Sequence, residues 1–327
     1  MKRLILVLLL AVAALFVASL ALGPAGMPIG QSLTALVIDD QGPLSMVMRE
    51  IRLPRALLGL MIGISLGMAG AGMQGYLRNP LADPGLIGVS GSAALGAVLA
   101  IHTGLSAAFV LGLPLAALAG ALASVFLVMA LAGPRGGSLT LILAGIAISS
   151  LAGALSSLVL NLSPNPFAAN EIVFWMMGSL ADRSMTHVWL ALPLMGIGWA
   201  LLGSLPRGLD ALTLGEDAAE SMGINLTHLR LKLVVGTAAS IGAATAVAGA
   251  IGFVGLVVPH ILRPYVGARP GRLLWASALG GAVMVLAADI VVRLVLPTQD
   301  LKLGVLTALV GAPLFLHLIY KTRKAGV

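Results

Sequence analysis

The stretch from Arg52 to Gly91 constrains this chain more than any other part of the sequence. Between Arg55 and Arg78 lie 22 residues without a formal charge. That is enough to cross a hydrocarbon core of about 30 Å as a helix rising about 1.5 Å per residue. Small residues recur along it at i+4 spacing: Gly59, Gly63, Gly67, Ala71 and Gly75. Because small residues let helices approach closely in lipid, we expect a tightly packed transmembrane helix here.

Composition extends this interpretation to the whole chain. The 327 residues are 59% hydrophobic and 9% charged, with a mean hydropathy of +1.06. Soluble globular proteins are about 25% charged, so the composition indicates a polytopic membrane protein in a lipid bilayer. At about 20 residues per span, the length allows about ten helices and no sizeable soluble domain. We therefore expect an all-α fold with one transmembrane domain, residues 1–327.

Several function classes are disfavoured by residue content. The net charge of +7 sits mostly at helix ends, which favours topology signals over nucleic-acid binding. The chain has no cysteine, which excludes disulfides and thiolate metal sites. The five histidines are scattered without metal-ligand spacing, and no Ser/His/Asp set can be assembled. We expect no metal, no cofactor and no enzymatic activity in this chain.

Apolar runs mark the predicted spans. They cover residues 4–23, 55–77, 85–104, 106–132, 139–162, 185–205, 229–250, 272–296 and 303–320. The first run exceeds the core of about 7–15 residues found in cleaved signal peptides, so we expect a retained span. A further run, 251–262, is short enough to be half-spanning.

Charge bias favours a crossing at 251–266. With that crossing, 13 of the 19 Lys and Arg residues lie inside and 6 outside; without it the division is 9 and 10. Only the first arrangement follows the positive-inside rule. We therefore expect ten spans with both termini cytoplasmic. Residues 24–54 then form an external segment that we expect to be partly helical.

The internal loop, residues 206–229, carries a predicted amphipathic helix within 210–224. Leu214, Ala218, Ala219 and Met222 are assigned to one face, Glu216, Asp217 and Glu220 to the others, and Gly223 to the end of the helix. A helix this short is not stable alone, so it needs a partner. From the residues alone, a solvated connector and a docking helix for an ATPase remain equally open.

Positive residues at the outer mouth run against topology preference. Arg52 and Arg55 lie one turn apart, and Arg293 is expected at the same level. Asp289 precedes Arg293 by four residues, so the two side chains could pair locally. We favour the alternative, in which the arginines accept acidic side chains of an external partner.

The predicted spans hold almost no ionisable side chain near the bilayer centre. Carriers driven by protons or sodium normally keep carboxylates or histidines there, which disfavours a secondary transporter. The chain also lacks a Gly-x-x-x-x-Gly-Lys-Ser/Thr phosphate loop, so any ATP hydrolysis belongs to another polypeptide. A nucleotide-independent transporter or channel, or a scaffold that transports nothing, remains a rival hypothesis.

Eight motifs occur in order between about Arg49 and Lys321. They are Arg-Leu-Pro-Arg (52–55), Gly-Met-Gln (72–74), Arg-Asn-Pro-Leu-Ala-Asp-Pro-Gly-Leu-Ile-Gly-Val-Ser-Gly (78–91), Phe-Trp-Met-Met-Gly-Ser-Leu (174–180), Leu-Gly-Glu-Asp-Ala-Ala-Glu-Ser-Met-Gly-Ile (214–224), Gly-Phe-Val-Gly-Leu-Val-Val-Pro-His-Ile-Leu-Arg (252–263), Ala-Asp-Ile-Val-Val-Arg (288–293) and Gly-Val-Leu-Thr-Ala-Leu-Val-Gly-Ala-Pro-Leu-Phe (304–315). In this order they resemble the FecCD-type permeases of type II ABC importers, which move iron–siderophore complexes, haem and cobalamin.

The resemblance implies a subunit of ten helices in the bacterial inner membrane. It further implies a homodimer with the pathway at its two-fold interface. Two cytoplasmic ATPases, which bind ATP and Mg, and a periplasmic substrate-binding protein are the implied partners. We expect an iron–siderophore complex or haem as the substrate, with cobalamin as the alternative.

Site residues carry over by position. Arg52, Arg55 and Arg293 are implied to receive acidic residues of the binding protein. The implied ATPase coupling residues lie within 212–224 and comprise Leu214, Gly215, Glu216, Asp217, Ala218, Ala219, Glu220, Met222 and Gly223. Gln74, Asn79 and Leu81 are assigned to the pathway and its cytoplasmic gate. The chain departs from the family pattern before Gly304, where Asp300-Leu301-Lys302-Leu303 replaces Glu-Leu-Pro; Lys302 could therefore add a fourth positive docking contact.

Overall fold

Helices joined by loops make up the computed structural model, which describes residues 1–23, 29–37, 42–133, 137–163, 165–295 and 301–324; no strand occurs among them. The long or apolar helices are α1 (Lys2–Ala21), α4 (Leu53–Tyr76), α5 (Val89–His102), α7 (Gly112–Ala132), α8 (Ser138–Asn161), α10 (Met185–Gly203), α13 (Leu226–Ala248), α14 (Val254–Leu262), α15 (Pro270–Val295) and α16 (Leu303–Lys324). Within the described ranges, seven helices are long and apolar enough to cross a membrane, and shorter apolar helical stretches cover Val89–His102, Val254–Val266 and Leu303–His317. The predicted all-α membrane fold is confirmed, with a helix in each predicted span.

Shorter elements connect these helices. They are α2 (Ile29–Val37), α3 (Pro43–Met46), η1 (Val47–Arg52), η2 (Pro84–Ile87), α6 (Leu105–Ala108), α9 (Pro166–Met176), α11 (Pro206–Leu212), α12 (Glu216–Ser221) and η3 (Arg263–Val266). Residues 24–54 were expected to be partly helical, and α2, α3 and η1 confirm this for the described part of that segment. Helix α9 was not expected, because its run of 11 residues is too short to register as a span. Asp300 of the departing motif lies outside the described residues.

Two predicted span boundaries were wrong. The span at 85–104 begins only at Val89, because η2 and the left-handed Gly88 (φ 75°) interrupt the chain first. The span at 106–132 is divided into α6 and α7. Gly112 starts the longer helix, and a Cβ there would lie 2.5 Å from the Leu105 carbonyl oxygen. The close turn between the two helices therefore depends on a residue without a side chain.

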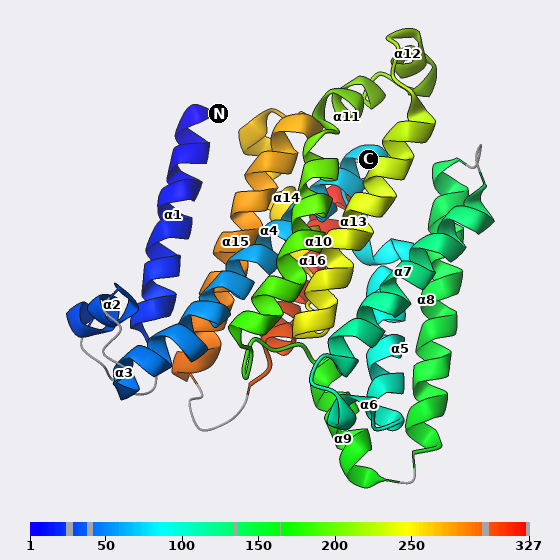
Figure 1. Ribbon diagram of the computed structural model, residues 1–327. Coiled ribbons are helices and arrows are strands. Elements are labelled where there is room, and N and C mark those ends of the chain that lie inside the picture. Colours follow the sequence, from blue (N-terminus) through cyan, green and yellow to red (C-terminus); the bar gives the residue numbers. More distant parts are fainter. Residues whose placement is uncertain (24–28, 38–41, 134–136, 164, 296–300, 325–327) are drawn as a thin grey trace.

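Helix α4 runs through the middle of the bundle, flanked by α10, α13, α14 and α15 (Figure 1). Its small-residue face packs against α15. A Cβ on Gly63 would lie 2.5 Å from the Cα of Ala282, and one on Gly67 would overlap the Ser277 carbonyl. On another side, a Cβ on Gly70 would overlap the Gly255 carbonyl of α14. The predicted close approach is confirmed, and backbone lies against backbone on two sides of α4.

A buried carboxylate joins α4 to α15. Asp289 is almost fully buried, and its Oδ1 accepts a hydrogen bond of 2.9 Å from Arg55 Nε. Its Oδ2 lies 3.0 Å from Nη2 of Arg293 on the same helix. One carboxylate therefore pairs with two guanidiniums that come from different helices and leaves one positive charge in the cluster, and the local pairing of Asp289 with Arg293 is confirmed.

Two arginines also hold the end of α1. Arg293 Nη1 donates to the carbonyl oxygens of Ser19 (2.9 Å) and Leu22 (3.1 Å). Arg52 Nη1 donates to those of Leu20 (2.8 Å) and Ala21 (2.9 Å). The last carbonyls of a helix lack intrahelical partners and attract cations. These contacts therefore fix a helix whose sides are otherwise mostly exposed.

The first prediction concerns the small-residue face. Gly67→Ala should lower the yield and the melting temperature of the purified protein, because the added methyl overlaps the Ser277 carbonyl. Overpacking of this kind costs about 1–3 kcal/mol or more. Gly196→Ala in α10 is the matched control, since nothing lies within 4 Å of a Cβ there. Equal melting temperatures for the two variants would contradict the packing account.

The second prediction concerns the shared carboxylate. Asp289→Asn leaves the Arg55 and Arg293 guanidiniums without their counter-ion, and breaking a buried pair costs on the order of 3–5 kcal/mol. The melting temperature should fall clearly relative to Asp217→Asn, which removes an exposed carboxylate. If the two variants have the same melting temperature, the pairing of Asp289 with Arg55 and Arg293 does not stabilise the fold.

Candidate functional site

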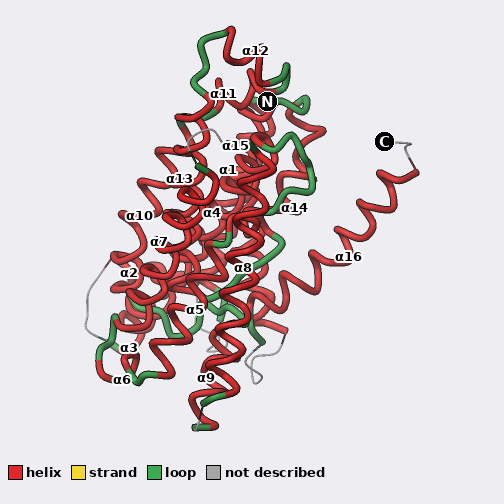
Figure 2. The backbone as a smooth tube through the Cα atoms, turned by 90° about the vertical axis from the view of Figure 1, so that its right-hand side faces the viewer, coloured by secondary structure: helices red, strands yellow, loops and turns green. Residues whose placement is uncertain are grey.

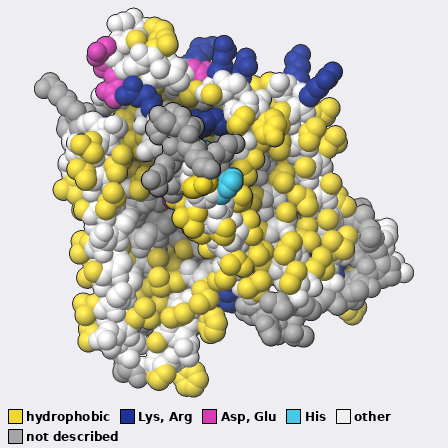
Figure 3. Space-filling model, turned by 180° about the vertical axis from the view of Figure 1, so that it is seen from behind, with side chains coloured by type: hydrophobic (Ala, Val, Ile, Leu, Met, Phe, Trp, Pro, Cys, Tyr) yellow, Lys and Arg dark blue, Asp and Glu magenta, His cyan; other side chains and the backbone are white. Residues whose placement is uncertain are grey.

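The two ends of the bundle differ in structure and charge. Helices α11 and α12 project from one end, and α2, α3, α6 and α9 lie at the other (Figure 1). Lys and Arg side chains gather along the edge of the α12 end, whereas hydrophobic side chains cover much of the flank below it (Figure 3). This distribution agrees with the charge bias in the sequence.

The predicted short helix within 210–224 is present as α12, and the segment also takes in the end of a second helix, α11. Helix α11 ends at Leu212 and α12 begins at Glu216, with Gly215 between them at a φ of 107°. The expected shared face was wrong: Ala219 is buried, whereas Leu214 is 69% exposed and Met222 is 53% exposed. Because Leu214 lies outside the helix, its side chain does not follow the helical spacing. The segment thus presents two large apolar side chains outward.

The projecting segment is nevertheless well anchored. Gly223 adopts a left-handed φ of 81°, and the next residue, Ile224, donates its N–H to the Ala219 carbonyl at 3.0 Å. This is the predicted helix end, and it is confirmed. Asp210 Oδ1 accepts the Gly271 N–H at the start of α15 at 2.8 Å. Glu216, Asp217 and Glu220 are exposed.

The predicted gate residues lie next to this segment. Asn79 is exposed, and its Oδ1 accepts the Leu81 N–H at 2.9 Å, which shapes the loop after α4. Arg78 adopts a φ of 50°, and its Nη2 lies 4.0 Å from Oε1 of Glu216. The structure therefore brings α12 close to the loop after α4, residues 77–83, which is the predicted gate loop. An exposed ion pair of this length contributes only about 0–1 kcal/mol.

Gln74 lies inside the protein between α4 and α14. Its Nε2 donates to the Leu256 carbonyl at 3.2 Å, and its Oε1 accepts from Arg263 Nη2 at 2.6 Å. Arg230 is also buried and donates to the Gly133 carbonyl at 2.9 Å. Sequence reasoning did not assign these two arginines, since nothing in the sequence indicates which distant carbonyl or amide a basic side chain will meet.

At the opposite end, the predicted docking residues have different surroundings. Arg52 is 5% exposed and the Arg293 side chain 9% exposed, and both are directed to the end of α1. The Arg55 side chain is 17% exposed and also lines a pocket of about 180 Å³. The Lys302 ammonium lies 5.4 Å from the ring centre of Phe174. Docking by these four side chains remains a prediction.

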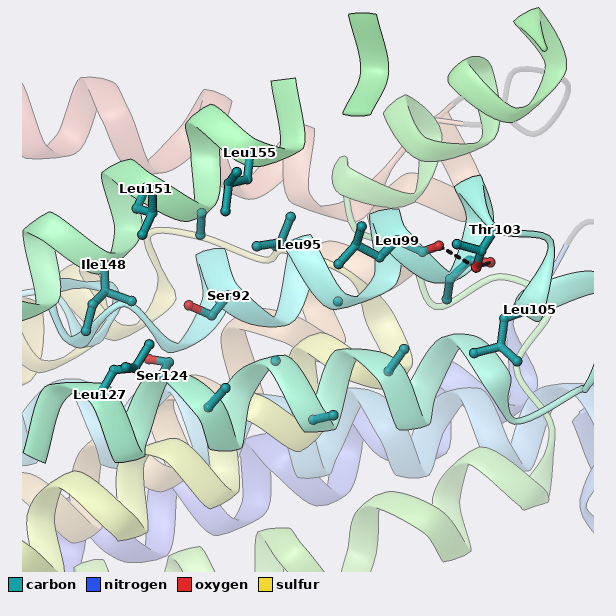
Figure 4. Close-up of a pocket in the computed structure, with 17 residues that line it drawn as sticks. Ser92, Leu95, Leu99, Thr103, Leu105, Ser124, Leu127, Ile148, Leu151 and Leu155 are labelled. Carbon is teal, nitrogen blue, oxygen red and sulfur yellow. Dashed lines mark hydrogen bonds between the residues drawn. The ribbon is translucent and has the colours of Figure 1, made fainter. Parts of the chain in front are cut away.

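A cavity of about 500 Å³ lies between α5, α7 and α8 (Figure 4). Leu95, Leu99, Leu151 and Leu155 form part of its lining. Its hydroxyl groups include Thr103, which donates to the Leu99 carbonyl, and Ser124, which donates to the Ile87 carbonyl. A cavity of this chemistry suits apolar contact rather than recognition of a charged ligand. In the part of the chain that the structure describes, no three His, Cys, Asp or Glu side chains come together as a metal site.

Comparison with known proteins places these features in a family. The sequence model of the FecCD transport family matches residues 9–321. The Fe(3+) dicitrate transport system permease protein FecD of Escherichia coli is 38% identical, over 85% of this chain and 86% of its own length. The vitamin B12 import system permease protein BtuC of Klebsiella pneumoniae is 39% identical, over 85% of this chain and 83% of its own length.

A solved structure agrees with this assignment. It shows a metal-chelate type ABC transporter in an inward-facing conformation, with a TM-score of 0.87 and 33% identity, covering 98% of this chain and 100% of the other. The family match spans nearly all of the sequence, and the fold and the spans agree with it. The chain therefore belongs to the FecCD transport family, as a multi-pass membrane permease subunit of the ABC transporter type.

Proposed function

We propose that this chain is the permease of an ATP-driven importer for a bulky metal chelate, either an iron–siderophore complex or haem. The observation that carries the proposal is the anchored α11–α12 segment, which presents apolar and acidic side chains outward at one end of the bundle. A short projecting segment of this kind suits docking to a separate ATPase. The names of FecD and of the metal-chelate type transporter support the choice of substrate.

The mechanism that we propose is alternating access. Closure of two cytoplasmic ATPase subunits, which hold ATP and Mg, moves α12. Glu216 of α12 lies near Arg78 of the gate loop, and Asp210 of α11 accepts the Gly271 N–H of α15. The movement of α12 therefore reaches the bundle through these two contacts. Asn79 and Leu81 then widen or narrow the cytoplasmic end of the pathway. The chain itself contributes no cofactor and no catalytic residue.

A homodimer completes the pathway. Helix α16 leans away from the rest of the bundle (Figure 2). Its large apolar side chains include Leu309 and Leu316, both of which are exposed. A second copy would cover them and provide the other wall of the pathway, as closed two-fold assemblies commonly do.

The proposed location is the bacterial inner membrane, with the α11–α12 end in the cytoplasm. The N-terminus and the end of α16 lie toward that same end, and most basic side chains gather there (Figures 1 and 3). The opposite end, which includes α2, α3 and α9, then faces a periplasmic substrate-binding protein. Ligand selectivity would reside mainly in that protein.

Cobalamin is a second candidate substrate, favoured by a specific observation. The cobalamin import system permease protein BtuC of Halobacterium salinarum is 37% identical over 93% of this chain and 88% of its own length. That identity is close to the 38% shared with FecD, so sequence similarity does not separate the two substrates.

The third prediction tests the substrate. The permease with its ATPase in lipid nanodiscs should hydrolyse ATP several-fold faster with a binding protein loaded with an iron–siderophore complex or haem than with the empty one. If only a cobalamin-loaded binding protein stimulates ATP hydrolysis, the substrate is cobalamin rather than an iron–siderophore complex or haem. No ATP-dependent response to any loaded binding protein would reject the importer function.

The fourth prediction tests coupling. Replacing Glu216, Asp217 and Glu220 with Lys reverses three exposed charges on α12. ATPase binding should weaken at least about tenfold, equal to about 1.4 kcal/mol, while the melting temperature of the permease stays the same. Glu171→Lys on α9 is the control at the opposite end. Full ATPase binding and uptake in the triple variant would remove the coupling assignment.

A further inference from the structure

Three exposed arginines lie near one another where α15 begins. Arg269 and Arg272 are one turn apart there, and the Arg269 carbonyl accepts the Leu273 N–H at 3.0 Å. Arg207 lies close by on α11, because a Cβ on Gly271 would be only 2.9 Å from the Cβ of Pro206. Arg207, Arg269 and Arg272 form what we call the α15 basic cluster.

The α15 basic cluster is not paired with acidic side chains of the chain itself. None of its three guanidiniums makes an ion pair with a residue that the structure describes. The sequence between residues 251 and 288 contains no aspartate or glutamate. Asp210 lies on α11, but its Oδ1 already accepts the Gly271 N–H at 2.8 Å and so caps the start of α15. The cluster therefore presents three positive charges beside one carboxylate that has its own hydrogen bond.

Aromatic side chains place the α15 basic cluster at the level of the membrane surface. Trp275 follows Arg272 by one turn on α15 and is 48% exposed. Its ring lies against the end of α10, since a Cβ on Gly203 would be 3.0 Å from its Cη2. Tyr265 of η3 is 68% exposed. Tryptophan and tyrosine concentrate where lipid headgroups meet the hydrocarbon, and α12 projects beyond the level at which α1 and α15 begin (Figure 1). The three guanidiniums therefore lie among the lipid phosphates of the leaflet on the α12 side.

We propose that the α15 basic cluster binds the phosphate of an anionic phospholipid, such as phosphatidylglycerol, from that leaflet. Guanidiniums bind phosphate oxygens through charge-assisted and often bidentate hydrogen bonds. A zwitterionic headgroup such as phosphatidylcholine brings its own cation, which three guanidiniums repel. The acyl chains of the bound lipid then run along α15 past Trp275. The proposal needs only a membrane-embedded chain, so it does not depend on the substrate or on the import activity.

The position of the lipid also gives it a structural consequence. Arg207 belongs to α11 and Arg272 to α15, the two helices that the hydrogen bond between Asp210 and Gly271 already joins. A phosphate held by both arginines would be a second link between α11 and α15. Because it binds the folded protein, anionic lipid should raise the melting temperature.

The test measures quenching of tryptophan fluorescence by lipids with brominated acyl chains in vesicles that contain the purified chain. Brominated phosphatidylglycerol should quench more strongly than brominated phosphatidylcholine. Trp275→Phe should abolish this preference, whereas Trp189→Phe, near the opposite end of α10, should leave it intact. The double variant Arg207→Gln, Arg272→Gln should lower the preference about fivefold for each guanidinium removed.

Two further variants control for folding and for general surface charge. Lys2→Gln with Arg3→Gln removes two exposed charges from α1 at the same end of the bundle and should keep the preference. Arg207→Lys with Arg272→Lys keeps the charge and should retain part of it. All variants should melt like the unmodified chain in phosphatidylcholine, and phosphatidylglycerol should raise the melting temperature of the unmodified chain but not of the double Gln variant.

Four outcomes would overturn the proposal. The double Gln variant could keep the full preference for phosphatidylglycerol, or the α1 variant could lose as much of it, which would indicate surface charge alone. Inorganic phosphate could displace phosphatidylglycerol from the unmodified chain at matched ionic strength, which would indicate a site for a free anion. Weaker binding of the ATPase to the double Gln variant in pure phosphatidylcholine nanodiscs would assign the cluster to the ATPase instead.

Discussion

Close contact between the backbones of α4 and α15 underlies the arrangement of the other helices. In lipid there is little hydrophobic gain from bringing helices together, so association relies on packing and on polar contacts. At Gly63 and Gly67 there is no room for a methyl group. The pair therefore forms a rigid centre. Arg55 of α4 and Asp289 of α15 are held close enough to form an ion pair.

This centre positions both ends of the bundle. At one end, the gate loop follows α4 directly, and α15 begins where Asp210 of α11 accepts its Gly271 N–H. At the other end, Arg52, which directly precedes α4, and Arg293 of α15 hold the end of α1. A displacement of α12 would therefore be transmitted to α4 and α15, which cross the whole bundle. This arrangement agrees with a transporter whose energy comes from a separate ATPase.

Much of this fold could be predicted from the sequence, because the signals were local. Apolar runs predicted the ten long or apolar helices of the described chain, and the i+4 pattern of small residues predicted the packed face of α4. Gly223 was correctly placed at the end of α12. The failures were also physical. Leu214 was wrongly placed on the helix face, because α12 begins only after Gly215, whose φ of 107° has no periodic signature in the sequence. The partners of Arg52 are carbonyls 31 and 32 residues away, and every residue carries a carbonyl, so no residue type could identify them.

In the proposed function, the chain supplies only the transport pathway, whereas ATP hydrolysis and substrate capture belong to separate proteins. The most direct test is reconstitution of the purified chain alone in sealed vesicles, with a labelled iron chelate outside and an imposed proton or sodium gradient. We expect no accumulation above the external concentration until the ATPase, ATP and the binding protein are all added. Uphill accumulation by the chain alone would contradict it.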